Sequence, residues 1–428
     1  MPALKTILLG AALLSVVAGQ TAPTTEEEEA AILDGTQECV AYGLKLVTDA
    51  LAANQFPPLD PTTPVPDVRN DTAGTQKFQE IEKSIPNIPV KTEGGTYDNA
   101  GDPDCYWTET QCVVPKHTGI KPDIAMAPEP RTLGYGFDDG PACDHNVFYN
   151  YLSAQKQQAT MFYIGKNVIW YPLQAMRAAK DGHEICVHTW SHGYMTQMTN
   201  EQAFAELWYT IKAIKLVTGL TPTCWRPPHG DVDDRIRFIA QSLNLDTVMW
   251  RFDAFDWENG QNGITPTQIQ GFYDKLVGDA KSGALDSNGA IILAHELNNF
   301  TMQMAMDNYP KIKDAFDYVV PVAIAMNKTQ PYAETSVTLP SFSEFAAANG
   351  KSSSSSGPGS SSTGNTNTGS GSGNADAGSS SGNSDTGGNT NTTTAGSTAK
   401  GTGAASSLRL SSGASLWLSL LLAAVAWS

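Results

Sequence analysis

From Arg131 onward the sequence alternates between short apolar strands and amphipathic helical stretches, and this alternation limits the possible folds more than any other feature. Strands are predicted at residues 132–137, 160–164, 183–188, 224–227, 247–252, 290–295 and 319–325. Strand and helix pairs repeated in one run imply parallel strands that close into a barrel. We therefore expect an α/β fold, a distorted (β/α) barrel of about seven parallel strands.

The clearest helix of this region begins after Thr199. Gln202 completes a capping box with Thr199, and Gly219 supplies the end of the helix. The apolar positions between them form one face and are Phe204, Leu207, Trp208, Ile211 and Ile214. An amphipathic helix is therefore predicted between Thr199 and Gly219.

The first predicted strand ends in two adjacent carboxylates, Asp138 and Asp139. Neighbouring side chains on a strand point to opposite faces, so the two acids can share one site only where the strand breaks into a turn. Gly140 and Pro141 supply that break. Two acids at one strand end suggest two separate roles.

Two histidines four residues apart, His188 and His192, follow the third predicted strand. Imidazole pairs at this spacing are typical of metal ligands. One carboxylate and two imidazoles leave the fourth position of a tetrahedral ion open, which is the arrangement of a hydrolytic rather than a structural zinc site. The other carboxylate is then free to act as a base.

Three further motifs follow in order, and they are Arg226-Pro-Pro-His-Gly230, Asp253-Ala-Phe-Asp-Trp257 and Leu293-Ala-His295. Together with Phe137-Asp-Asp-Gly140 and His188-Thr-Trp-Ser-His192, they resemble the polysaccharide deacetylases of carbohydrate esterase family 4, and among those the GPI-anchored fungal chitin deacetylases. The resemblance covers residues 119–345. All five motifs lie at the C-terminal ends of predicted strands, where a βα barrel carries its active site.

The resemblance implies that Asp139, His188 and His192 hold one divalent metal per chain. Zn²⁺ is the expected ion because nitrogen and oxygen ligands with an open position suit it, although Co²⁺ or another divalent ion could replace it. Such an ion lowers the pKa of a water molecule towards neutrality. The resemblance gives Asp138 the role of the general base that takes the water's proton.

The remaining motifs imply the other catalytic roles. The backbone N–H of His229 stabilises the oxyanion, and His295 is the general acid for the departing amine. Asp256 resembles the carboxylate that raises the pKa of this histidine, and Arg226 resembles the residue that orients Asp138. A structural ion pair would have the same sequence at both positions.

Three residues are predicted to contact the substrate. Trp257 and Leu293 line the pocket for the acetyl methyl group by resemblance, although plain core residues would look the same. His229 replaces the usual Tyr at the rim, and imidazole is smaller, more polar and able to carry charge near pH 6.5. Gly136 replaces a common Thr or Ser, which removes a hydroxyl beside the metal.

The resemblance implies metal-dependent hydrolysis of the N-acetyl groups of chitin or partly deacetylated chitosan. Acetyl ester hydrolysis and peptidoglycan deacetylation are related alternatives. A non-catalytic, wall-anchored polysaccharide-binding protein is a third possibility, but such a protein has no use for a base, an acid and a metal together. The rim residue His229 suggests a preference for partly deacetylated chitosan.

The net charge of the chain indicates which kinds of binding partner are favoured. The chain has 27 basic and 44 acidic residues and a net charge of −17, which argues against a nucleic-acid partner held by charge. An acidic surface attracts a polycation such as chitosan, although solubility alone explains an acidic secreted protein equally well. We expect a monomer.

The chain ends predict export and anchoring. Residues 1–19 have the form of a secretory signal peptide, and residues 346–403 form a Ser-, Gly-, Thr- and Asn-rich tether that cannot bury a core. Residues 404–428 match a GPI-attachment signal, with Gly403 as the candidate attachment residue. A membrane span is the alternative, but the apolar run is too short to cross a bilayer as a helix. The protein is expected at the outer face of the plasma membrane and in the cell wall. The GPI lipid is its only expected attachment to the membrane.

Residues 20–118 are expected to form an irregular N-terminal extension packed on the catalytic domain, because their apolar content is thin. The Glu run at residues 26–29 is predicted to be solvated and to begin an amphipathic helix, whose apolar positions are Ala30, Ile32, Leu33, Val40, Leu44, Leu46 and Val47. The prolines of residues 57–66 predict an extended loop.

Six cysteines agree with an oxidising compartment, but they allow many pairings. A local disulfide between Cys105 and Cys112 is predicted because the short intervening loop closes easily. Cys186 and Cys224 share a strand face with other site residues and are expected close together, while their pairing and that of Cys39 and Cys143 stay open. The N-glycosylation acceptors are Asn70, Asn299, Asn327 and Asn391.

Overall fold

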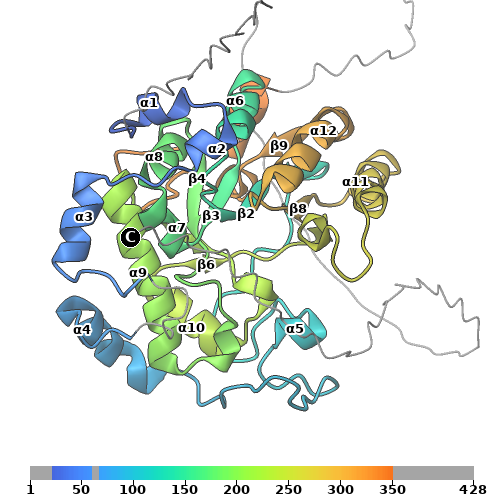
Figure 1. Cartoon of the computed structure of the whole chain (residues 1–428). Helices are drawn as coiled ribbons and strands as arrows, with labels where there is room; N and C mark the ends of the chain where they lie inside the picture. The colour runs from blue at the N-terminus through green and yellow to red at the C-terminus, as the bar shows by residue number, and fades with distance from the viewer. Residues whose placement is uncertain (1–21, 60–66, 350–428) are drawn as a thin grey trace, which may run out of the picture. The chain divides into compact units, whose positions relative to one another are not determined.

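The computed structural model describes residues 22–59 and 67–349 (Figure 1). The predicted signal peptide, most of the proline-rich loop, the tether beyond residue 349, the GPI signal with Gly403 and the acceptor Asn391 lie outside these residues. None of the described helices has the length and apolar character needed to span a membrane.

Within residues 22–59 and 67–349, nine strands form two parallel sheets inside a layer of helices (Figure 1). Their bounds are β1 Thr132–Gly134, β2 Gly136–Gly140, β3 Thr160–Tyr163, β4 Glu184–Val187, β5 Cys224–Trp225, β6 Asp246–Thr247, β7 Phe252–Asp253, β8 Ala290–Leu293 and β9 Tyr318–Val320. One sheet has the order β7-β8-β1-β9 and the other the order β2-β3-β4-β5-β6. Every strand pairing is parallel, as the alternation of strands and helices predicts.

The two sheets join into a distorted barrel at two places. A parallel bridge between Asp138 and His295 connects the end of β2 to the end of β8. The segment that contains β6 and β7 pairs with β5 at its start and with β8 at its end. These links close the ring, so the expected α/β barrel is confirmed.

Several predicted strands are shorter than expected, among them residues 224–227, of which only Cys224–Trp225 form β5. Residues 247–252 do not form one strand, because β6 ends at Thr247 and β7 begins at Phe252. Residues 319–325 were expected to be extended, but β9 ends at Val320 and the helix α13, Val322–Ala325, follows. Pro321 stands between them, and proline cannot continue a strand ladder because it lacks the backbone N–H.

The helices that cover the barrel follow the strands in order. They are α6 Asn146–Ala154, α7 Gly165–Trp170, α8 Pro172–Lys180, α9 Asn200–Thr218, α10 Asp234–Ser242, α11 Pro266–Lys281, α12 Asn299–Ala315 and, after α13, α14 Phe342–Asn349. The capping box of α9 is present as predicted, with the Thr199 side chain accepting from the backbone N–H of Gln202. Gly219 ends this helix in the left-handed conformation that favours glycine.

The single N-terminal helix expected from the sequence is wrong. The segment forms α1 Glu26–Ala30, α2 Gly35–Glu38 and α3 Lys45–Ala52, then α4 Thr72–Ile81 and α5 Trp107–Thr110. Asp34 caps α2 with its own side chain and so starts a new helix. Leu33, Val40 and Leu46 are exposed, which shows why the apolar pattern did not mark a buried face.

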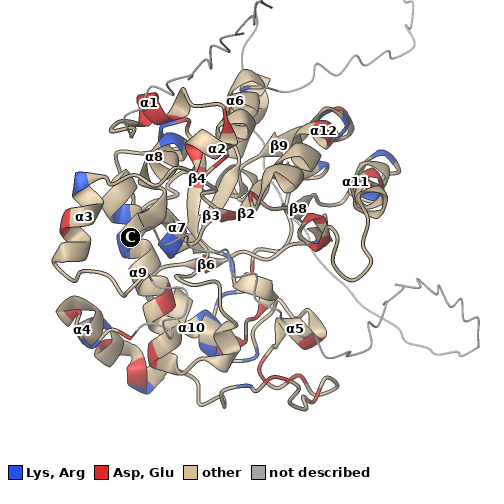
Figure 2. Ribbon diagram, viewed as in Figure 1, with Lys and Arg blue, Asp and Glu red and all other residues tan. Residues whose placement is uncertain are grey.

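The Glu run is not wholly solvated either. Glu29 is fully buried, and its carboxylate accepts a hydrogen bond from the Asn146 amide at 2.9 Å. Glu38 is also buried and accepts from the backbone N–H of Asn146 at 2.7 Å. The extension therefore binds the first turn of α6 through two buried acids, and Figure 2 shows acidic residues on α1 and along the loop beside α5.

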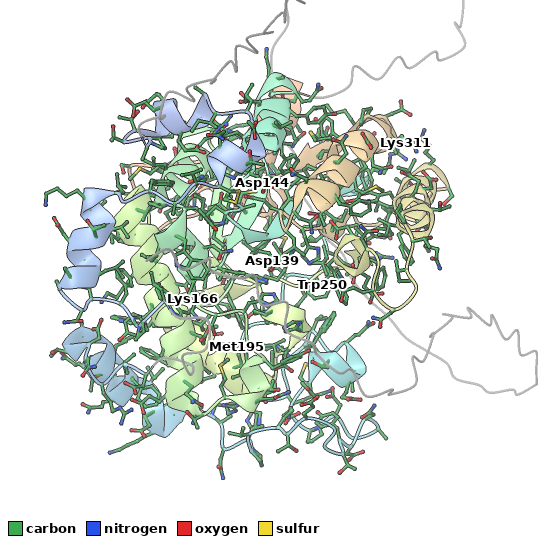
Figure 3. All side chains as sticks on the ribbon, viewed as in Figure 1. Asp139, Asp144, Lys166, Met195, Trp250 and Lys311 are labelled. Atoms are coloured by element: carbon green, nitrogen blue, oxygen red, sulfur yellow. A yellow bond between two sulfur atoms is a disulfide. The ribbon has the colours of Figure 1, made fainter. Side chains whose placement is uncertain are left out.

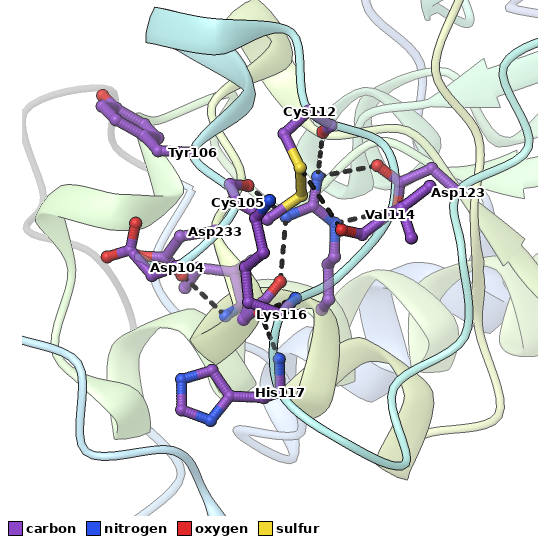
Figure 4. A network of polar contacts seen from close by, with 12 residues as sticks. Asp104, Cys105, Tyr106, Cys112, Val114, Lys116, His117, Asp123 and Asp233 are labelled. Carbon is purple, nitrogen blue, oxygen red and sulfur yellow. Dashed lines mark hydrogen bonds and ion pairs between the residues drawn. A yellow bond between two sulfur atoms is a disulfide. The ribbon is translucent and has the colours of Figure 1, made fainter. Parts of the chain in front are cut away.

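Three disulfides use all six cysteines. The predicted Cys105–Cys112 bond is present (Figure 4). The buried Arg237 guanidinium donates to the backbone carbonyl groups of both cysteines. Cys186 and Cys224, expected close together, form a second bond between β4 and β5. The third bond, Cys39–Cys143, ties the extension to the loop that follows the Asp-Asp motif.

Candidate active site

Asp138 and Asp139 reach one site because β2 is irregular where they stand. The pairing of β2 with β3 shifts register between Asp138 and Gly140, which is a β-bulge. Asp139 has a φ of 74°, a left-handed conformation that is uncommon for a residue other than glycine. The bulge re-aims one side chain, so neighbouring carboxylates that a regular strand would separate lie together.

The two histidines come from the chain that leaves β4. The Nε2 atom of His188 lies 3.4 Å from Oδ1 of Asp139, and Nε2 of His192 lies 3.1 Å from the same oxygen. Nδ1 of His188 hydrogen-bonds the backbone carbonyl of Arg226 at 2.8 Å. Because that bond uses Nδ1 as a donor, the neutral imidazole leaves the lone pair of Nε2 for a ligand.

Asp139, His188 and His192 fit a divalent metal. One possible donor atom from each lies within 4.8 Å of the others. Oδ1 of Asp139 is buried next to the two imidazole nitrogen atoms but makes no well-aligned hydrogen bond to either, as expected of an atom whose partner is an ion. Burial alone would raise the pKa of Asp139, but His192, His188 and His295 hold that pKa well below its usual value, so the carboxylate is charged (Figure 3 labels Asp139).

Arg226 and Asp138 form a buried ion pair beside this cluster. Their atoms Nη1 and Oδ1 are 2.7 Å apart, and both side chains are nearly inaccessible. The guanidinium also lies over the Phe162 ring, 4.0 Å from its centre. Burial lowers the pKa of Arg226, while the charge of Asp138 opposes that change. The pair holds one Asp138 oxygen and leaves the other 3.8 Å from Nε2 of His188.

His295 and Asp256 form a second buried pair. Nδ1 of His295 lies 2.6 Å from Oδ1 of Asp256, and the other carboxylate oxygen accepts from the backbone N–H of His295 at 2.9 Å. Burial alone would lower the pKa of His295, but the charge and hydrogen bond of Asp256 raise it to about 10. The imidazole is therefore protonated at neutral pH and can give up a proton.

His229 lies at the rim, in the short 3₁₀ turn η3, Pro228–Gly230, with a φ of 59°. The hydrogen bonds of this turn are donated by Gly230 and Asp231, so the N–H of His229 takes no part in them. The His229 ring packs edge-on against His192, with ring centres 4.6 Å apart. It also stacks on Tyr194, whose side chain comes from the segment just after His192.

The surroundings of His229 disfavour a charge on its ring. Although the residue is exposed, its ring packs against the rings of both His192 and Tyr194. Burial of the ring, with repulsion from His192 and His188, lowers the pKa of His229 to about 4. The lowered pKa favours the neutral form of this side chain.

The two residues predicted to line the acetyl pocket, Leu293 and Trp257, differ in how far they are buried. Leu293 is buried at the end of β8, and Trp257 is half-buried in the 3₁₀ turn η4, Asp256–Glu258. A Cβ at Gly136 would come within 2.8 Å of the Thr160 carbonyl oxygen, so the close approach of β2 to β3 leaves no room for Thr or Ser here. The glycosylation acceptors Asn70, Asn299 and Asn327 are exposed, and their use stays a prediction.

Two buried acids beside the site were missed from the sequence. Glu206 on α9 accepts hydrogen bonds from the loop between His188 and His192. Glu296 follows His295 directly and accepts from the backbone N–H of Ala142, next to the Asp-Asp turn. One signal was available, because Glu206 stands among the buried positions of an otherwise apolar helix face.

A protonated histidine and an arginine-held carboxylate lie at the C-terminal ends of barrel strands, beside a cluster that fits a divalent cation. This arrangement is typical of metal-dependent hydrolases. Residues 125–248 match the polysaccharide deacetylase family. Chitin deacetylase 2 of Cryptococcus neoformans var. grubii is 48% identical over 75% of this chain and 72% of that protein, and the chitin deacetylase of Amylomyces rouxii is 42% identical over 72% and 74%. The chain therefore belongs to the polysaccharide deacetylase family and is an enzyme.

A solved structure, that of the chitin deacetylase from the fungal pathogen Colletotrichum lindemuthianum, is also similar. Its TM-score is 0.44 at 19% sequence identity, and the match covers 49% of this chain and 92% of that one.

Proposed function

We propose that this enzyme hydrolyses the N-acetyl groups of chitin or partly deacetylated chitosan and releases acetate. The observation that carries the proposal is the bridge between Asp138 and His295. It brings the proposed base and the proposed acid onto paired strands, with the Asp139, His188 and His192 cluster beside them. Relatives that share most of their length with this chain are chitin deacetylases, which supports the choice of substrate.

A divalent cation held by Asp139, His188 and His192 would polarise the acetyl carbonyl and lower the pKa of a water molecule, with Zn²⁺ as the expected ion and Co²⁺ or another ion as alternatives. The protein's own groups do the rest. Asp138, oriented by Arg226, takes one proton from the attacking water, whose oxygen bonds to the acetyl carbon. The backbone N–H of His229 donates to the oxyanion that develops.

The second half of the reaction needs an acid. His295 is charged because of Asp256, and it gives its proton to the amide nitrogen as the C–N bond breaks. The products are acetate and a glucosamine unit, and the proton held by Asp138 returns to solvent or to His295. Leu293 and Trp257 are proposed to contact the acetyl methyl group, which fits the buried position of Leu293 at the end of β8.

Acetate release from defined oligomers tests this function. Chitin oligomers, acetylated xylan and peptidoglycan fragments are compared at equal concentrations of acetyl groups, with wild type and a His295→Ala control. Acetate from the chitin series alone supports the proposal. Faster release from xylan esters or peptidoglycan would favour the related enzymes, and binding without acetate release would favour a non-catalytic wall protein.

We also propose that the enzyme is exported, anchored by a GPI lipid near Gly403 and held at the outer membrane face or in the cell wall. The signal-like residues 1–19 and the spacer and apolar tail at residues 404–428 support this proposal. Phospholipase treatment of intact cells should release the protein. An intact C-terminal peptide in the mature protein would rule the lipid out.

We further propose that the enzyme is a monomer, that its substrate is a polysaccharide and that it has no nucleic-acid partner. The net charge of −17 is unfavourable for a phosphate backbone and favourable for a cationic product such as chitosan. Sedimentation of the secreted protein checks the monomer, and a mass of twice the chain would contradict it.

A further inference from the structure

The loop between His188 and His192 is held by two helices, one on each side. α9 contributes the carboxylate of Glu206, and α7 contributes the backbone N–H groups of its first turn. Neither helix belongs to the five sequence motifs of the site. Figure 3 labels Lys166 at the start of α7 and Asp139 at the site.

Glu206 binds the backbone of the loop directly. One oxygen, Oε2, accepts from the N–H groups of Trp190 and Ser191, both at 2.8 Å. The other, Oε1, accepts from the Ser191 hydroxyl at 2.7 Å. The side chain is fully buried, and burying a carboxylate is costly unless such hydrogen bonds compensate it. Both carboxylate oxygens of Glu206 are therefore used in hydrogen bonds to this loop.

The carbonyl groups of the same loop are held from the opposite side. The N–H of Gly165 donates to the Thr189 carbonyl at 2.9 Å, and the N–H of Lys166 donates to the Trp190 carbonyl at 3.2 Å. A Cβ at Gly165 would lie 2.5 Å from the Trp190 ring, so only glycine allows α7 to come this close. The peptide units before His192 are therefore hydrogen-bonded through both their N–H groups and their carbonyl groups.

The loop needs such support because its backbone is strained. Thr189 and His192 have φ values of 63° and 59°, which side-chain-bearing residues seldom adopt. Such conformations persist only where the surrounding structure enforces them. His192 is also the most accessible of the three proposed ligands, with 31% of its side chain exposed, so packing holds it less than it holds His188.

We propose that Glu206 is a positioning residue that fixes the turn carrying His192 and thereby sets the affinity of the site for its divalent cation. The proposal rests on the ligand set assigned under the proposed function. Glu206 acts through the backbone of Trp190 and Ser191, so geometry rather than charge is the property that matters. Partners of this kind typically change metal affinity 10- to 100-fold.

Two conservative variants separate geometry from charge. Glu206→Gln keeps the length, and its amide oxygen can accept from both N–H groups while its amide NH₂ donates to the Ser191 hydroxyl. Glu206→Asp keeps the charge but is too short to reach both N–H groups. We expect Gln to bind Zn²⁺ within about threefold of wild type and Asp to bind it about 10-fold or more weakly.

The measurement is the affinity of the secreted full-length protein for Zn²⁺, in competition with a chelator, together with the absorption spectrum of the Co²⁺ form. Glu206→Ala should weaken Zn²⁺ binding 10- to 100-fold and alter the Co²⁺ spectrum. Glu184 supplies a matched control, because it is a buried acid at the other end of the barrel that accepts from Thr160 and from the N–H of Ala323. Glu184→Ala should lose stability but keep metal affinity.

The outcomes are distinct. Unchanged affinity in Glu206→Ala, or equal loss in Glu206→Ala and Glu184→Ala, overturns the proposal. If the Ala variant does not fold, the Gln and Asp variants decide, and tighter binding by Asp than by Gln overturns it. Retained affinity in His192→Ala would show instead that the ligand assignment, and with it the proposed function, is wrong.

Discussion

The imidazole of His229 stacks on the phenol of Tyr194, with ring centres 4.1 Å apart and ring planes 14° apart. His229 stands where the family commonly has Tyr, and the exposed Tyr194, with 46% of its surface accessible, lies against it at the rim. An aromatic surface beside the proposed metal cluster is therefore retained, although the sequence position that usually supplies it holds a histidine. Aromatic faces at such a rim are suited to stacking on sugar rings.

We predict that His229→Tyr shifts the substrate preference towards fully acetylated oligomers. The neutral imidazole gives a less apolar rim than a phenol, and this rim should tolerate a glucosamine neighbour better. The ratio of kcat/KM on fully acetylated and partly deacetylated oligomers measures the effect. Tyr194→Ala should raise KM for both substrates several-fold, and Tyr194→Phe should behave like wild type. Equal ratios in wild type and His229→Tyr would remove this side chain from the explanation of specificity.

We predict that Asp138→Asn abolishes most turnover while the metal stays bound. The amide keeps the shape of the side chain but cannot accept a proton, so a loss of about 10²- to 10⁴-fold in kcat is expected. Asp139→Ala, His188→Ala and His192→Ala should each lose the metal itself. Acetate release and metal content are measured on the same samples, and substantial turnover by Asp138→Asn would show that the base and the ligand are wrongly assigned.

The pH dependence of the enzyme should depend on Asp256. With its pKa raised to about 10, His295 keeps its proton through neutral pH, so activity that needs this acid should decline only in the alkaline range. In Asp256→Asn the burial of His295 is no longer opposed by the carboxylate, and the alkaline limb of the kcat profile should move to lower pH by one unit or more. An unchanged alkaline limb would show that another group is the acid.

The His295–Asp256 pair also affects the free energy of unfolding, and the direction of the effect with pH follows from the raised pKa of His295. The pKa of His295 is higher in the folded state than its unfolded value of about 6.5, so its stabilising contribution is fully present below that pH. The contribution is lost as the pH rises through about 10. Urea unfolding of wild type and Asp256→Asn at pH 6 and pH 10 should therefore show a larger difference at pH 6.

The disulfides should contribute unequally to stability. Cys39–Cys143 joins residues 104 apart in the sequence, whereas Cys105–Cys112 joins residues 7 apart. In the loop-entropy description the longer loop stabilises the protein by about 2 kcal/mol more. Paired Cys→Ala variants of each bond, compared by urea unfolding, measure this difference, and non-reducing peptide mapping checks the three pairings. A greater loss from the Cys105–Cys112 pair would contradict the expectation.

How much of this could be predicted from the sequence depends on the range of the interactions. The alternation of strands and helices gave the barrel class, because burial on one face leaves a local period in the sequence. The turn after Asp139, the capping box at Thr199 and the local Cys105–Cys112 pair were also predicted, and each depends on residues a few positions apart. The five motifs stand at strand ends, so barrel topology alone indicated that they meet.

Predictions from the sequence were wrong or could not be made where contacts between distant segments determine burial or a pKa. The N-terminal apolar pattern did not reveal that Glu29 is buried, because its partner Asn146 lies more than a hundred residues away. The low pKa of His229 comes from burial of its ring and from repulsion by His192 and His188, and no sequence spacing shows these surroundings.

What the sequence determined by itself is the kind of barrel and the identity of the residues that gather at its C-terminal end. What only the tertiary structure decided is how those residues are held. The bulge that turns Asp139 into the site and the hold of Glu206 on the loop before His192 both depend on elements that become neighbours when the barrel closes. A pattern of apolar positions records that a residue is buried, but the backbone groups it will meet are set by packing between distant segments.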